Sequence, residues 1–147
     1  MRSTVRLLLL LQAAAFIAAA LMHFGVLVGG YTHVKAGIAE SVIGTVLLAG
    51  LVFTTLWPAS AYAAAIAAQS FALLGTALGL FMIAIGIGPR TTLDLVFHVG
   101  VVIALVSSLV ATIKAARGAY GGGNRGYIEI EQQFSRRERS TFIQKSD

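Results

Sequence analysis

The sequence predicts an all-α integral membrane protein folded as an antiparallel four-helix bundle. Of its 147 residues, 57% are hydrophobic and only 12% are charged, a composition outside the range of soluble domains. About 20 consecutive apolar residues cross the hydrocarbon core of a bilayer as a helix, and four segments reach that length: 5–28, 34–57, 59–87 and 92–113. The connections between these segments are short, which favours antiparallel packing of consecutive helices.

The first two segments begin and end at recognisable signals. The opening residues around Arg2 and Arg6 resemble a secretory signal peptide. The apolar run continues beyond a usual signal core, so we expect it to be retained as the first transmembrane helix. The second segment stops before Pro58, because proline cannot continue a helix.

The third and fourth segments are separated by a strong break at Gly88-Pro89. The fourth then opens with Thr91-Thr92-Leu93-Asp94, a pattern typical of a capping box at a helix start. Gly75 and Gly79 form a GxxxG pattern in the third segment, which permits close packing between helices.

The composition changes after the fourth segment. We predict a transmembrane domain over residues 1–117 and a flexible, glycine-rich and charged tail over 118–147. Basic residues gather before the first segment and after the fourth, which by the positive-inside rule places both termini in the cytoplasm. This placement explains the net charge of +5 without nucleic-acid binding.

Three ionisable residues lie at matching depth within the apolar segments. His23, Glu40 and His98 each fall a similar distance from the outward end of their segment, roughly 8 to 9 Å at 1.5 Å per residue. Because charges inside hydrocarbon are costly, such residues indicate a binding or catalytic site. We expect their side chains to converge in the bundle near the outer leaflet, with Asp94 beside His98 on the fourth helix.

These donors are compatible with three kinds of ligand. His23, Glu40 and His98 match the 2-His-1-carboxylate set that binds a divalent metal, with Asp94 as a fourth ligand or as a partner orienting His98. His23 and His98 are alternatively axial ligands of haem b. A quinone headgroup held by histidine, Glu40 and Arg90 is the third option. The chain has no cysteine, so no thiolate contributes.

Each residue also has a structural interpretation. Asp94 fits a capping role whatever the function, and Glu40 is placed to pair with Lys35 or Arg90. His23 is able to hydrogen-bond across helices without a ligand. His33 and Arg90 are expected in loops, as secondary members of any site.

Two stretches resemble known bacterial membrane proteins. The stretch HFGVLVGGYTHVKAGIAESVIGTVLLAG resembles the DoxX-like group of small four-helix proteins, and ALLGTALGLFMIAIGIGPRTTLDLVFH resembles an uncharacterised four-helix family with a GPRT, Asp, His signature. The first resemblance implies a bacterial inner-membrane location and an association with quinone-linked oxidoreductases. Residue by residue, the DoxX-like resemblance extends to Glu40 and His23 only.

The sequence therefore favours a small multi-pass protein of the bacterial inner membrane that binds a metal, haem or quinone as an accessory to redox chemistry. Whether it catalyses a reaction is left open. The alternative is a structural or assembly subunit without a cofactor, working as a homo-oligomer or within a larger membrane complex.

Overall fold

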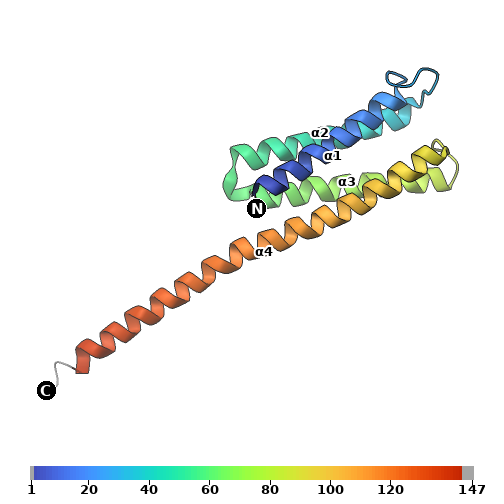
Figure 1. Cartoon of the computed structure of the whole chain (residues 1–147). Helices are drawn as coiled ribbons and strands as arrows, with labels where there is room; N and C mark the ends of the chain where they lie inside the picture. The colour runs from blue at the N-terminus through green and yellow to red at the C-terminus, as the bar shows by residue number, and fades with distance from the viewer. Residues whose placement is uncertain (1, 144–147) are drawn as a thin grey trace. The chain divides into compact units, whose positions relative to one another are not determined.

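The four-helix prediction is confirmed. The computed structural model describes the backbone of residues 2–143 and the side chains of residues 3–120, 132–134 and 136. Its long helices are α1 (Arg2–His23), α2 (Val34–Leu56), α3 (Ala61–Ala84) and α4 (Thr92–Ile143), with a short 3-10 turn, η1 (Pro58–Ser60), before α3. Consecutive helices pack antiparallel within residues 1–113 (Figure 1).

The outer surface of the helices is apolar. Four helices are long and apolar enough to cross a membrane. Large hydrophobic side chains that in water would be buried are exposed, among them Leu7, Leu11, Leu74, Leu78 and Ile103. An apolar surface of this kind on four helices of spanning length is typical of lipid contact, and the chain is therefore a multi-pass membrane protein.

Small residues bring the helices close together. Ala13 on α1 and Ala65 and Ala72 on α3 are completely buried. A Cβ added at Gly50 on α2 would lie 2.6 Å from the Cβ of Ala68 on α3. Close backbone approach of this kind replaces the hydrophobic effect as the source of helix association inside a bilayer.

Buried polar residues connect the helices in the middle of the bundle and at one of its ends. In the middle of the bundle, the Gln69 amide on α3 donates to the Ser108 hydroxyl on α4 at 2.5 Å, and to Gln12 on α1 at 3.4 Å. At the end opposite the loops that follow α1 and α3, the Arg6 guanidinium donates to the carbonyl oxygen of Thr54 at 2.6 Å. These bonds fix the depth of one helix relative to the next.

The first helix ends earlier than predicted. The apolar run suggested a segment to residue 28, but α1 ends at His23 and residues 24–33 form a folded loop. Gly25 adopts φ of +75°, a left-handed conformation that favours glycine and terminates helices. A bridge between Phe24 and Thr32 then turns the chain back toward α2.

The region after the bundle is helical in the structure. The chain divides into two units, 1–113 and 114–147. The helix α4 extends to Ile143, and glutamate, glutamine and arginine after the glycines have high helix propensity. The boundary at residue 117 and the flexibility of the tail over 118–147 stay predictions.

Replacing Gly50 with alanine is expected to destabilise the bundle. The new Cβ would overlap Ala68, and overpacking costs typically 1–3 kcal/mol, so thermal unfolding in detergent should occur several degrees lower. Gly100→Ala is the matched control, because nothing lies within 4 Å of an added Cβ there. Equal melting temperatures for the two variants would contradict the close contact of α2 and α3.

Candidate functional site

One imidazole links three helices at the end of the bundle that carries the loops 24–33 and 85–91. His23, the last residue of α1, places Nδ1 2.6 Å from Oε2 of Glu40 on α2. Its Nε2 lies 3.1 Å from Oδ1 of Asp94 on α4. All three residues are buried, with at most 4% of their surface exposed.

Asp94 is surrounded by hydrogen-bond donors. The Tyr31 hydroxyl donates to both carboxylate oxygens, at 2.6 and 2.5 Å. Both the backbone N–H and the hydroxyl of Thr91 donate to Oδ2, at 3.1 and 2.5 Å. Together with His23 these donors match the acceptor capacity of an ionised carboxylate, so Asp94 is held as an anion.

The predicted capping box is confirmed. The Asp94 N–H donates to the Thr91 hydroxyl at 3.2 Å, while the Asp94 carboxylate accepts from the Thr91 N–H. These reciprocal bonds satisfy two of the free N–H groups at the start of α4. Asp94 therefore fixes the helix start and contacts His23 at the same time.

The loop after α1 contributes a residue that the sequence analysis missed. The His33 N–H donates to the carbonyl oxygen of His23 at 2.7 Å, and this closure stacks the Tyr31 ring on the His23 ring with centroids 5.5 Å apart. Burial raises the pKa of Tyr31, and its hydrogen bond to Asp94 adds to the shift. Tyr31 therefore remains a hydrogen-bond donor. The sequence signal that could have identified this residue is a tyrosine directly after Gly29 and Gly30 in a loop.

Glu40 is bonded on one side only. Its Oε2 meets His23, but its Oε1 is buried and has no hydrogen-bond partner among the described residues. A buried polar atom without a partner is uncommon and indicates a ligand, water or functional role.

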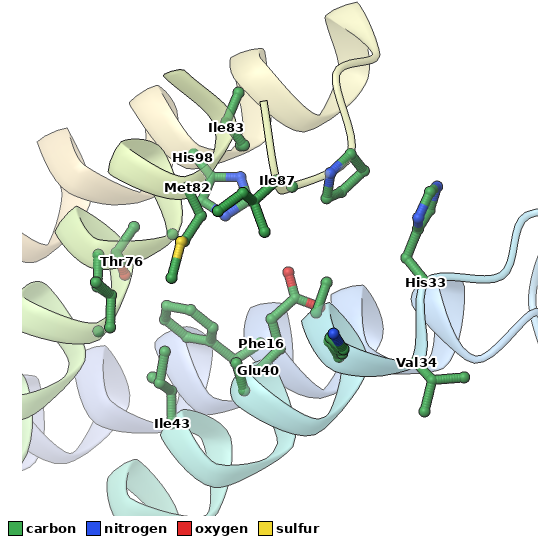
Figure 2. A pocket seen from close by; sticks show the side chains of 18 residues that line it. Phe16, His33, Val34, Glu40, Ile43, Thr76, Met82, Ile83, Ile87 and His98 are labelled. Carbon is green, nitrogen blue, oxygen red and sulfur yellow. The ribbon is translucent and has the colours of Figure 1, made fainter. Parts of the chain in front are cut away.

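Glu40 also lines a cavity of about 470 Å³ between α2, α3 and α4. The walls are mainly apolar, with contributions from Phe16, Ile43, Met82, Ile83 and Ile87. The Glu40 carboxylate on α2 and the His98 imidazole on α4 face this cavity from opposite sides (Figure 2). A cavity of this size accommodates a small ligand.

His98 is oriented by its own helix. Its Nδ1 lies 2.7 Å from the carbonyl oxygen of Asp94, and since a carbonyl only accepts, Nδ1 carries the proton. The other edge of the ring lies against Gly79, where an added Cβ would be 3.0 Å from Nε2. Gly79 of the GxxxG pattern thus makes room for His98, while Gly75 makes room for Ile43 on α2.

The remaining predicted residues have peripheral positions. His33 is exposed at the edge of the cavity, with its ring 5.0 Å from that of Tyr31. Arg90 is exposed and donates to the carbonyl oxygens of Ile83 and Ala84 at the end of α3. Glu40 pairs with His23, and neither Lys35 nor Arg90 is its partner.

The geometry does not favour the metal or haem interpretations. Within the part of the chain that the structure describes, no group of three or more His, Cys, Asp or Glu side chains is arranged to hold a metal ion. Both ring nitrogens of His23 face carboxylates, so neither is directed at an iron shared with His98. The set His23, Glu40 and His98 finds no support as metal ligands.

Comparison with known proteins identifies no relative. No family model, curated protein or solved structure matches the chain. The properties of the site therefore rest on its own residues.

Removing the Tyr31 hydroxyl is expected to destabilise the protein by about 1.5–3 kcal/mol, because a bond to an ionised group is lost. A pKa raised above the usual 10.0 means that the bond contributes fully below pH 10 and is lost as pH rises through the folded-state pKa. The melting temperatures of wild type and Tyr31→Phe should differ at pH 8 and converge in strong alkali. Tyr120→Phe, at an exposed position, is the control; a Tyr31→Phe variant that melts like wild type at pH 8 would refute the assigned bond.

Proposed function

We propose that the protein binds the headgroup of a lipid-soluble quinone in the cavity between α2, α3 and α4, as an accessory to membrane redox chemistry. One observation carries this proposal: Glu40, which has a buried carboxylate oxygen without a partner among the described residues, lines a mainly apolar cavity of about 470 Å³. A ligand for such a site has an apolar body and a few polar groups at its end.

The chemistry of the lining favours a quinone over the other ligands considered. A quinone headgroup is a flat apolar ring with two oxygen atoms, and it needs hydrogen-bonding side chains without needing a set of metal ligands. Glu40 and His98 supply such side chains from two helices, and Phe16 and Met82 supply apolar contacts. Aromatic and thioether side chains adapt well to a flat ring.

The position of the cavity suits a ligand that arrives through the bilayer. Its wall includes the exposed apolar residue Leu78 on α3 and reaches Val34 and Lys35 at the start of α2. A ligand with an isoprenoid tail can then place its ring inside while the tail remains in lipid. With both termini in the cytoplasm, as the positive-inside rule predicts, the cavity lies in the outer leaflet of a bacterial inner membrane.

The resemblance to DoxX-like proteins agrees with this proposal. That resemblance extends to Glu40 and His23, and it implies association with quinone-linked oxidoreductases. In the structure His23 bonds one oxygen of Glu40, and the other oxygen is buried without a partner among the described residues.

Gly79→Ala is expected to weaken quinone binding about tenfold or more. The new Cβ would lie 3.0 Å from His98 Nε2 and would displace the imidazole, and a 1 Å misplacement is costly in a small site. Binding of a short-chain quinone to the protein in nanodiscs, measured by equilibrium dialysis, provides the test. Gly100→Ala has open space around its Cβ and should bind like wild type.

A wild-type protein that binds no quinone up to the solubility limit would overturn the proposal and favour the structural or assembly role. Binding that is equal in Gly79→Ala and wild type would place the ligand elsewhere on the molecule.

A further inference from the structure

We infer that the cavity selects the reduced form of its ligand, the hydroquinone, over the oxidised quinone. This inference rests on the proposed function and concerns the redox state that the site recognises. The two forms differ in hydrogen-bonding character: a hydroquinone carries two O–H donors, whereas a quinone carries two carbonyl acceptors. The polar atoms deep in the cavity therefore decide between them.

Glu40 presents an acceptor to the cavity in either protonation state. Its Oε2 lies 2.6 Å from His23 Nδ1, so a proton in this contact is shared between those two atoms. The other oxygen, Oε1, is then a carboxylate or a carbonyl oxygen, and both only accept. Because Oε1 is buried without a partner among the described residues, a ligand hydroxyl would satisfy it.

His98 presents a second acceptor. Its Nδ1–H is used by the Asp94 carbonyl oxygen at 2.7 Å, so in the neutral imidazole the lone pair is on Nε2.

Thr76 adds a third acceptor from α3. This residue is buried and lines the cavity. Its hydroxyl proton is donated to the carbonyl oxygen of Ala72 at 2.7 Å, which leaves the oxygen lone pairs available. The buried residues Glu40, Thr76 and His98, which line the cavity from α2, α3 and α4, therefore all offer hydrogen-bond acceptors.

Donors lie at the edge of the cavity. Lys35 and His33 contribute to the lining but are exposed. The ammonium and imidazole groups of these two residues are therefore in contact with solvent. A quinone carbonyl placed deep in the cavity would face acceptors only and would leave Glu40 Oε1 unsatisfied. Sites built to bond a hydroxyl reject analogues that lack it for this reason.

The preference has a measurable redox consequence. Two net hydrogen bonds of ordinary strength correspond to a preference of about five- to 150-fold for the hydroquinone. For a two-electron couple, each tenfold preference raises the reduction potential of the bound ligand by about 30 mV.

The test compares the two redox forms of one probe. Decylubiquinol and decylubiquinone are titrated anaerobically into the full-length protein in nanodiscs, and the two dissociation constants are measured by equilibrium dialysis. We expect the reduced probe to bind at least about fivefold more tightly. Equal binding, or tighter binding of the oxidised probe, would overturn this inference and leave the proposed function intact. Binding of neither probe would overturn both.

A substitution at Glu40 tests whether the preference for the reduced probe arises in the cavity. In Glu40→Gln the amide oxygen is able to accept from His23 and the amide N–H₂ then faces the cavity as a donor, so the preference for the reduced probe should fall to about one or reverse. Ser41→Ala on the same helix, whose hydroxyl bonds the Gly37 carbonyl, should keep the wild-type ratio. If Glu40→Gln does not fold, Thr76→Val removes one acceptor and should lower the ratio several-fold. A ratio unchanged in the variant tested would refute the assignment.

Discussion

The structure depends on the need to satisfy two carboxylates inside an apolar bundle. Burying Glu40 and Asp94 without partners would be costly, and one imidazole, His23, reaches both of them. That single ring requires the end of α1 to lie between α2 and α4. The loop after α1 must then fold back so that Tyr31 completes the donors around Asp94. Helix order, helix depth and loop conformation thus follow from one electrostatic requirement.

Polar contacts occur at three levels of the bundle and connect different helices at each. The carboxylate–imidazole chain joins α1, α2 and α4 at one end, Gln69 joins α3 to α4 in the middle, and Arg6 joins α1 to α2 at the other end. Between these levels the contacts are made by small and apolar side chains. Since apolar packing in lipid specifies depth poorly, the polar levels give the helices a unique register.

The sequence predicts the helices well and the site only in part. Apolar length, prolines and the capping pattern locate all four helices, and the burial cost of ions selects His23, Glu40 and His98, with Asp94 beside His98 on the fourth helix. Tyr31 is not predicted, because its reach depends on a loop closed by Gly25 and a bridge between distant residues. Matching depth along the chain also does not specify the direction of a side chain. His98 therefore seemed a partner of His23, although its Nδ1 bonds its own helix and its other edge faces α3.

The double role of Asp94 affects how genetic results for this protein should be read. The same carboxylate begins α4 and holds His23 and Tyr31. A screen that finds Asp94 intolerant to change would therefore report on membrane insertion and assembly of the fourth span together with any activity. Glu40 is different, because one of its oxygens has no structural partner in the described chain. Variants such as Glu40→Gln that can keep the bond to His23 would therefore separate a role in the cavity from a role in the fold.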